Sequence, residues 1–266
     1  MNWIAVLLLP GACAAGAGPD AAEAASGEAE KRPALTEPGV VLTFDDTFVS
    51  QWVAAMPLFE KCGAHATFFV TGFDELTPEQ VAGLQRLRQA GHAVGCHGLR
   101  HRKAVEYTEQ HSLDAYLRDD VTPAVALMDA AGLHPTSFAY PCSNNNEATD
   151  AALLERFRHL RTGAYPTEGE RIAQLDAIFT PINAVAARGC FAGRSMDRAG
   201  EPGHEDGIAQ VTEALDRALE KRELVVLYSH NIGTENRNHI LPGSLEQILA
   251  HAKRIGLRFY TFDDLP

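Results

Sequence analysis

From residue 39 onwards, short continuous apolar runs alternate along the chain with longer segments of helical periodicity. Residues 40–44 are mostly β-branched or aromatic and show no polar alternation, which predicts a strand buried on both faces. Residues 78–90 predict a helix, because Thr77 is a suitable N-cap and Gly91 follows the end. Strands are predicted at 40–44, 66–70, 92–95, 136–140, 224–228 and 258–262, and helices at 50–62, 78–90, 113–131, 147–158, 208–221 and 244–255.

Strands that alternate with helices predict an α/β protein with a parallel sheet and helical crossovers, either an open doubly wound sheet or a barrel. Pro123 lies inside the predicted helix 113–131 and predicts a kink or a break there. Residues 164–206 contain many Gly and Pro and show no clear periodicity. We therefore expect one large domain over residues 39–266, without internal repeats.

The first 38 residues differ in composition and hydrophobic pattern from the rest of the chain. An apolar run at 4–9, followed by small residues at 11–18, is typical of a secretory signal and too short to span a bilayer. Residues 9–13 also resemble a lipoprotein box, with Cys13 as the acylated residue. No Lys or Arg precedes the run, so a start of the chain with neither role remains the alternative. Residues 19–38 are rich in Ala, Glu, Gly and Pro, which is typical of a flexible linker.

These features predict a protein that is exported to the periplasm, the cell surface or the medium. We expect a signal over residues 1–18 and a linker over 19–38, with membrane attachment only through a lipidated Cys13. The net charge of −12 argues against nucleic acid as a partner, since phosphate binding requires clustered Lys and Arg. The five cysteines show no zinc-finger spacing, and most are expected to be small buried apolar residues.

Three polar clusters each follow a predicted strand. Asp45 and Asp46 follow the first strand, His97 and His101 follow the third, and His230 comes directly after the strand 224–228. Because the loops after parallel strands gather at one end of such folds, we expect these side chains to converge.

Together these side chains can form a metal site. A catalytic zinc-type site uses three protein ligands and leaves one position open. His97 and His101 are four residues apart, and Asp45 or Asp46 supplies a carboxylate, a set that favours zinc, cobalt or nickel over magnesium. The other Asp is then free to act as a general base, and His230 as a general acid. The alternatives are a chance His spacing, Asp residues that only form a turn, and a structural histidine.

Five stretches of the chain occur in an order that is known from one family. They are Leu42-Thr43-Phe44-Asp45-Asp46, Gly63-Ala64-His65-Ala66-Thr67-Phe68-Phe69-Val70, Ala90-Gly91-His92-Ala93-Val94-Gly95-Cys96-His97, Phe138-Ala139-Tyr140-Pro141 and Leu227-Tyr228-Ser229-His230. With these stretches, residues 39–266 resemble the polysaccharide deacetylase family (carbohydrate esterase family four), which includes chitin, peptidoglycan and acetylxylan deacetylases. Several motifs in order are more specific than any one of them.

The resemblance implies a distorted (β/α) barrel with about seven parallel strands. It also implies a hydrolase that removes acetyl groups from an N- or O-acetylated glycan with the help of a divalent metal, most simply zinc. An amidohydrolase for another small amide or formyl group, and a carbohydrate-binding protein without activity, are the alternatives. The implied roles are Asp45 as base, Asp46, His97 and His101 as metal ligands, His230 as acid, and a backbone N–H near Cys142 at the oxyanion, with Tyr140 and Arg161 as further candidates at the oxyanion or substrate.

The sequence departs from the family pattern around these residues. Gly98 stands where the family has Ser or Thr after the first histidine, so a hydroxyl that steadies the loop is absent. Ala139 stands where the family has an Arg that orients the base, and Cys142 replaces an aromatic residue. The family's fourth motif, an Asp and Trp pair, is not recognisable in residues 150–206. Arg161 either replaces the missing Arg or lies on the surface.

Overall fold

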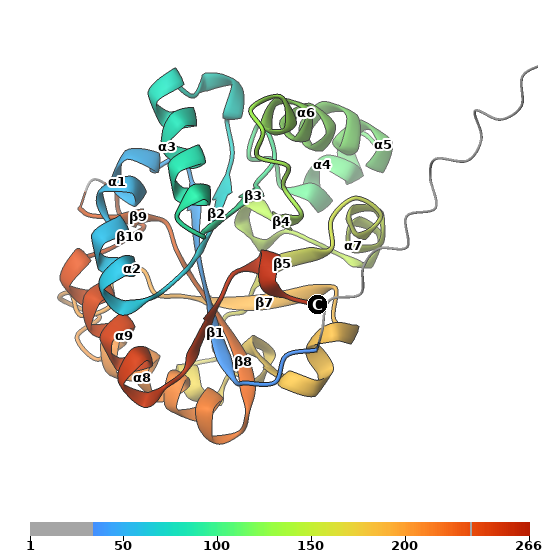
Figure 1. The fold of residues 1–266 in the computed structure, drawn as a ribbon. Coiled ribbons are helices and arrows are strands. Elements are labelled where there is room, and N and C mark those ends of the chain that lie inside the picture. The colour runs from blue at the N-terminus through green and yellow to red at the C-terminus, as the bar shows by residue number, and fades with distance from the viewer. Residues whose placement is uncertain (1–33, 235) are drawn as a thin grey trace, which may run out of the picture. The chain divides into compact units, whose positions relative to one another are not determined.

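Seven parallel strands close into a barrel in the computed structural model, which describes residues 34–234 and 236–266 (Figure 1). The barrel closes where Gly39–Phe44 of the first strand pair with Leu224–Ser229. This architecture confirms the distorted (β/α) barrel. The barrel strands are β1 (Gly39–Asp46), β2 (Thr67–Val70), β3 (Ala93–Cys96), β4 (Ser137–Ala139), β5 (His159–Gly163), β7 (Cys190–Ser195) and β8 (Glu223–Ser229).

The barrel is distorted because β1 shares one of its edges between two neighbours. β11 (Arg258–Tyr260) pairs with the start of β1, and β2 pairs with its end. The short strand β6 (Phe179–Pro181) adds to β8 in the antiparallel direction. A further short pair joins β9 (Asn231–Ile232) to β10 (His239–Ile240) after the end of β8.

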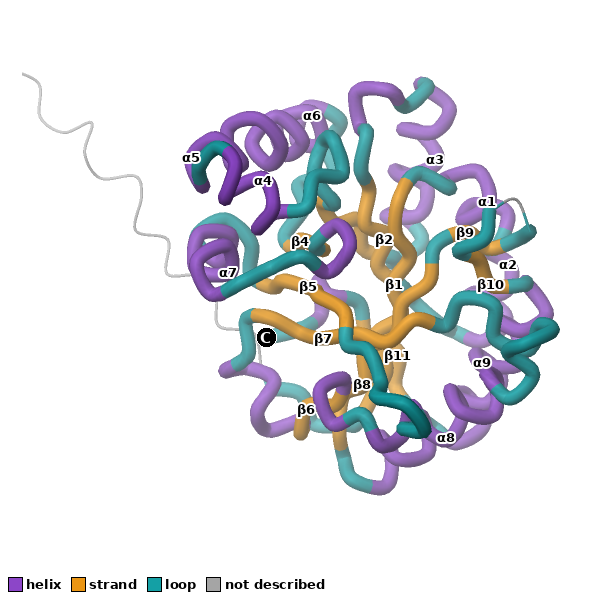
Figure 2. The backbone as a smooth tube through the Cα atoms, turned by 180° about the vertical axis from the view of Figure 1, so that it is seen from behind, coloured by secondary structure: helices purple, strands orange, loops and turns teal. Residues whose placement is uncertain are grey.

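Helices surround the strands on the outside, as the view from behind shows (Figure 2). In α8 the buried residues Val211, Ala214, Leu215 and Ala218 follow helical spacing, so one apolar stripe faces the barrel. The helices are α1 (Val49–Ala54), α2 (Met56–Cys62), α3 (Pro78–Gln89), α4 (Ala104–Gln110), α5 (Leu113–Tyr116), α6 (Thr122–Ala130), α7 (Glu147–Leu154), α8 (Gly207–Glu220) and α9 (Pro242–Ile255).

Two predicted helices are interrupted near prolines. The prediction 50–62 is divided into α1 and α2 at Ala55, and a proline lies in the first turn of α2. The prediction 113–131 is divided by a π-helical turn at Leu117–Val121, after which Pro123 lies in the first turn of α6. The expected interruption of this helix near Pro123 is confirmed, and it takes the form of a turn wider than an α-helical one.

The alternation of side chains along β1 decides which residues point into the barrel. Val41 packs in the inner apolar cluster, together with Phe69 of β2 and Val226 of β8. Residues two apart on a strand share a face, so Asp45 points inward on the same side as Val41. The interior therefore changes from apolar to charged towards the carboxyl ends of the strands.

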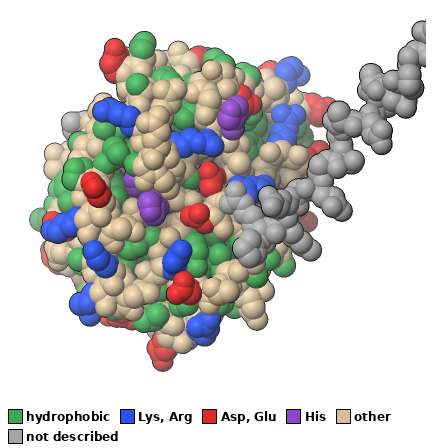
Figure 3. Space-filling model, in the orientation of Figure 1, with side chains coloured by type: hydrophobic (Ala, Val, Ile, Leu, Met, Phe, Trp, Pro, Cys, Tyr) green, Lys and Arg blue, Asp and Glu red, His purple; other side chains and the backbone are tan. Residues whose placement is uncertain are grey.

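The predicted signal and lipoprotein segments, and most of the predicted linker, lie outside the described residues. Within the described residues, no helix is both long and apolar enough to cross a membrane. Acidic and basic side chains are interspersed on the face shown in Figure 3. Among the four cysteines described, Cys62 and Cys96 are buried and Cys142 is exposed, and none of the four is in a disulfide.

Candidate metal and catalytic site

The strand register brings the predicted metal ligands to one rim of the barrel. Asp46 of β1 lies opposite Val70 of β2, which lies opposite Cys96 of β3. Asp46 and Cys96 are therefore on one row, and His97, which follows Cys96, emerges beside Asp46. The expectation that these loops converge at the carboxyl ends of the strands is confirmed for this pair.

Asp46, His97 and His101 form a cluster with metal-ligand geometry. One ligand atom of each residue lies within 4.8 Å of the others. The Oδ1 atom of Asp46 is 3.8 Å from Nε2 of His97 and 3.5 Å from Nε2 of His101. These distances leave room for an ion between the three atoms, and such a set leaves a coordination position open for another ligand.

His97 is held in the orientation that a ligand needs. Its side chain is buried, and its Nδ1 lies 2.8 Å from the carbonyl oxygen of Ala139. Because Nδ1–H donates to that carbonyl, Nε2 carries the lone pair and faces Asp46. Burial lowers the pKa of His97 to about 3, so the ring is neutral at ordinary pH. A neutral, fixed imidazole is ready to bind a metal.

The other two candidate ligands, Asp46 and His101, have an unusual backbone conformation. Asp46 has φ 84° and His101 has φ 51°, a left-handed conformation that is uncommon for residues other than glycine. Burial raises the pKa of Asp46, and neighbouring Asp45 adds to this effect although His230 opposes it. A cation at the cluster would favour the ionised form of Asp46. The donor set and its charge therefore fit a divalent transition metal.

Arg161 is the buried partner of Asp45, and the interpretation of Arg161 as a surface residue was wrong. It lies on β5 opposite Ala139, and its Nη2 forms an ion pair with Oδ2 of Asp45. Its guanidinium carbon lies 4.9 Å from the ring centre of Tyr228 and 5.6 Å from that of Phe69. The arginine that is missing from position 139 is thus supplied from the adjacent position of the next strand.

The charge of Asp45 depends on this partner. Burial alone would raise the pKa of Asp45, but the charges of Arg161, His97 and His230 outweigh burial and hold the pKa below its usual value. Asp45 is therefore ionised and can accept a proton. The hydrogen bond from Arg161 also fixes the orientation of the carboxylate.

Arg161→Leu is expected to lower the free energy of unfolding by about 3–5 kcal/mol at neutral pH, because it leaves the Asp45 carboxylate buried without a partner. Chemical denaturation with a chelator present measures this change without a contribution from metal. The double variant Arg161→Leu/Asp45→Asn should recover much of the loss, since it removes both charges. Equal losses in the single and double variants would contradict the importance of the ion pair.

His230 faces the same rim and has an acidic partner that the sequence did not reveal. Its Nδ1 lies 2.8 Å from Oδ2 of Asp197, and Ser229 donates a hydrogen bond of 2.6 Å to the other oxygen of Asp197. The indole of Trp52 donates to the carbonyl of His230 over 2.9 Å. Burial lowers the pKa of His230, but Asp197 and Asp45 outweigh this effect and raise it. The ring is therefore fixed, and its protonated form is favoured.

Asp197 lies just after β7, in the part of the chain whose pattern was not readable. Its place after the apolar start of β7 is the sequence signal that could have suggested it. Two further histidines in the second half of the chain, His239 and His204, lie outside the site. His239 belongs to β10 and its Nε2 lies 2.5 Å from Oε1 of Glu201, while His204 is exposed.

The five predicted catalytic and ligand residues line one cavity of about 340 Å³. Cys142 and Ser143 form part of its wall, and both have left-handed backbone, with φ 54° and 55°. Tyr140 and Arg161 also line the cavity, so all three of the less specific candidates are at the site. The residues that line it are Asp45, Asp46, His97, His101, Tyr140, Cys142, Ser143, Arg161, Tyr165, Asp197, Tyr228, His230 and Asn238.

Three consecutive asparagines, at positions 144–146, follow Cys142 and Ser143 and have structural roles. The side-chain oxygen of Asn144 accepts hydrogen bonds from the backbone of Val105 and Glu106 at the start of α4. Asn145 bonds to the side chains of Asp150 and Thr162, and Asn146 is the N-cap of α7. The asparagine side chains thus hold this loop in place rather than facing the cavity.

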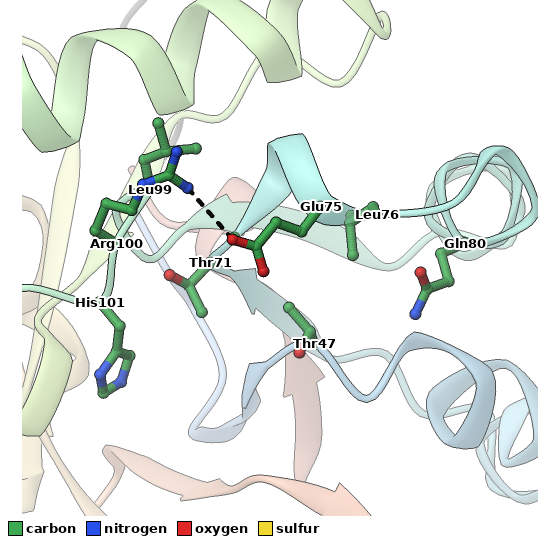
Figure 4. Close-up of a pocket in the computed structure, with 9 residues that line it drawn as sticks. Thr47, Thr71, Glu75, Leu76, Gln80, Leu99, Arg100 and His101 are labelled. Atoms are coloured by element: carbon green, nitrogen blue, oxygen red, sulfur yellow. Dashed lines mark ion pairs between the residues drawn. The ribbon is translucent and has the colours of Figure 1, made fainter.

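A second cavity of about 390 Å³ lies on the other side of His101 (Figure 4). Arg100 and Glu75 face each other there at 3.8 Å, and Arg100 also forms two hydrogen bonds to Asp74. His101 lines both cavities. The loop that carries the metal ligands therefore forms the wall between them.

A comparison with protein-family models gives a match over the first part of the barrel. Residues 32–156 match the family model described as polysaccharide deacetylase. The resemblance to the polysaccharide deacetylase family is thereby confirmed. A comparison with the sequences of curated proteins finds no significant match.

Solved structures of carbohydrate esterase family 4 have the same fold. A Streptococcus mutans esterase of this family matches with a TM-score of 0.57 and 21% identity, over 85% of this chain and 86% of that one. The catalytic domain of a peptidoglycan N-acetylglucosamine deacetylase from Eubacterium rectale matches with a TM-score of 0.52 and 20% identity, over 88% of this chain and 93% of that one. A mutant of a family 4 pseudoenzyme, with restored enzymatic activity, matches with a TM-score of 0.50 and 14% identity, over 86% of this chain and 68% of that one.

Proposed function

We propose that this protein is a metal-dependent hydrolase that removes acetyl groups from an N- or O-acetylated carbohydrate. The observation that carries the proposal is that Asp45 and His230 line the same cavity as the cluster of Asp46, His97 and His101. A base, an acid and a set of metal ligands are thus present together in a barrel of the polysaccharide deacetylase family. The most suitable metal for two imidazoles and one carboxylate is zinc, with cobalt and nickel as substitutes.

Each side chain has a role that follows from its surroundings. A divalent metal at the cluster supplies Lewis-acid chemistry, because it polarises a carbonyl and lowers the pKa of water. Asp45, ionised beside Arg161, takes the proton of the attacking water. His230, oriented by Asp197, gives a proton to the departing amine or alcohol. A backbone N–H near Cys142, a residue that lines the cavity, would stabilise the negative charge on the acetyl oxygen.

Two alternatives have different substrates or no reaction. An amidohydrolase for a small amide or formyl group would use the same side chains, since they act on any carbonyl that reaches them. A protein that only binds carbohydrate is the second alternative, and the family does contain a pseudoenzyme. The presence of all five predicted residues in one cavity favours an active enzyme, because a binding protein requires neither the base nor the acid.

The acetate released from acetylated oligosaccharides and from small amides tests the proposal. We expect metal-dependent release from an acetylated glycan, and a much lower rate with small amides and formyl compounds. Acetate would be measured in a coupled assay with zinc, and again after removal of zinc with a chelator. Hydrolysis of the small amides alone would support the first alternative, and glycan binding without release would support the second.

Export remains a prediction. It would place the enzyme where extracellular or cell-wall glycans are accessible. Detection of the protein in the periplasmic, membrane and culture-medium fractions would test it, and a Cys13→Ser variant would show whether membrane attachment depends on a lipid at Cys13.

A further inference from the structure

The loop that carries His97 and His101 lacks the hydroxyl that steadies it in the family, because Gly98 follows the first histidine. The structure places a buried carboxylate at that position instead. Asp120, from the π-helical turn between α5 and α6, is fully buried beneath the loop. A π-helical turn in this place is consistent with a functional role, since such turns are frequent at functional sites.

Asp120 contacts the backbone of the loop, and its Oδ1 also lies 3.8 Å from Nε of Arg102, the residue after His101. Its Oδ1 accepts a hydrogen bond of 2.6 Å from the N–H of Arg100. Its own carbonyl accepts one of 3.1 Å from the N–H of Leu99. The carbonyl of Leu99 accepts in turn from the N–H of Gly72 over 3.1 Å. The backbone between the two histidines is therefore fixed on both sides.

The second oxygen of Asp120 explains why residue 98 is a glycine. This Oδ2 is buried and has no hydrogen-bond partner among the residues that the structure describes, and a Cβ atom at residue 98 would overlap it. Gly98 also has φ 73°, a conformation that glycine adopts without strain. The carboxylate thus occupies the space of the side chain that Gly98 lacks.

We propose that Asp120 is a positioning residue for the metal site, which replaces the missing hydroxyl, and that Gly98 is needed to admit its carboxylate. By accepting the hydrogen bond of the Arg100 N–H, the carboxylate of Asp120 keeps the adjacent His101 in its left-handed conformation with Nε2 facing Asp46. Outer groups that orient metal ligands in this way commonly contribute a factor of about 10–100 to metal affinity. The inference rests on the metal site of the proposed function, but it does not depend on the reaction or its substrate.

Zinc affinity, measured by competition with a chromophoric chelator, tests the role of Asp120. We expect Asp120→Ala to weaken zinc binding about 10- to 100-fold while one ion still binds at saturation. Asp119→Ala is the matched control, because it removes a carboxylate from the same turn. The hydrogen bonds of Asp119 go to Tyr107 and Arg118 and not to the loop, so its zinc affinity should stay within about threefold of the wild type. Asp120→Asn keeps the size and one acceptor oxygen, and should give an intermediate loss.

Gly98→Ala tests the contact between the two residues by a double-mutant cycle. In the wild-type background the new Cβ would displace the carboxylate, and zinc affinity should fall as far as in Asp120→Ala. In the Asp120→Ala background the same change should cause a clearly smaller further loss. If Gly98→Ala lowers zinc affinity equally in both backgrounds, the loss comes from the backbone conformation of residue 98 alone. The proposed contact between Gly98 and Asp120 would then be wrong.

Unfolding of each variant without metal separates a local effect from a loss of the fold. The inference requires folded variants with reduced zinc affinity, and Asp120→Asn decides the matter if Asp120→Ala does not fold. Wild-type affinity in folded Asp120→Ala or Asp120→Asn would overturn it. Failure of the wild-type protein itself to bind zinc would instead overturn the metal site of the proposed function.

Discussion

His97→Ala is expected to abolish tight binding of a divalent metal and to reduce deacetylation to the background rate. The side chain is buried and supplies one of the three ligand atoms of the cluster. Metal content after dialysis, measured by mass spectrometry, should fall from one ion per chain to a small fraction. His101→Ala should behave in the same way.

Asp45→Asn is the control for this prediction, since Asp45 adjoins a ligand but is directed towards Arg161. This variant should keep its metal and lose turnover. Full metal content in both histidine variants would contradict the ligand assignment. Loss of metal from Asp45→Asn would mean that the roles of the two aspartates are exchanged or shared.

His230→Ala is expected to bind metal normally and to lose roughly 10²- to 10⁴-fold in kcat, the usual range for one acid–base group. The ring lines the metal cavity, and Asp197 together with Asp45 raises its pKa, so it can hold a proton for the leaving group. Steady-state kinetics on an acetylated oligosaccharide would measure the loss. Asp197→Asn should cause a smaller loss, because the histidine remains but is less well oriented.

An activated aryl acetate separates the role of an acid from other roles of His230. Its leaving group departs without protonation, so the variant should lose much less activity with this substrate than with the glycan. Equal losses with both substrates would show that His230 is not the acid. Release of metal from the variant would show instead that His230 is a ligand.

Asp46 and His230 were predictable from sequence because each closely follows a strand with a clear apolar signal. Residues 40–44 are continuously apolar apart from one threonine, and residues 224–228 are similar, so the positions after them could be recognised as strand ends. Once the ends of parallel strands were located, convergence of Asp46, His97 and His230 followed from topology alone.

The partners of these residues could not be predicted in the same way. Arg161 lies within β5 and Asp197 just after β7, strands that include Arg, Thr and Gly and so lack the apolar pattern of β1. Arg161 and Asp45 are 116 positions apart, and only the register across the closed barrel brings them together. Asp120 could not be predicted either. It packs against Gly98, a residue without a side chain, so no pair of complementary side chains in the sequence indicates the contact.

The closure of the barrel through β1 and β8 has a consequence for how the chain reaches its native state. The first strand lies between partners that come from both halves of the chain, and its pairing with β8 joins residues about 180 positions apart. During synthesis, β1 and β2 can associate early, but the other edge of β1 stays unpaired until residues beyond 223 emerge. Contacts between such distant segments slow folding, and an unpaired edge favours association with other chains. Because Asp45 lies at the end of β1 and His230 follows β8, we expect the site to be incomplete until these two strands pair.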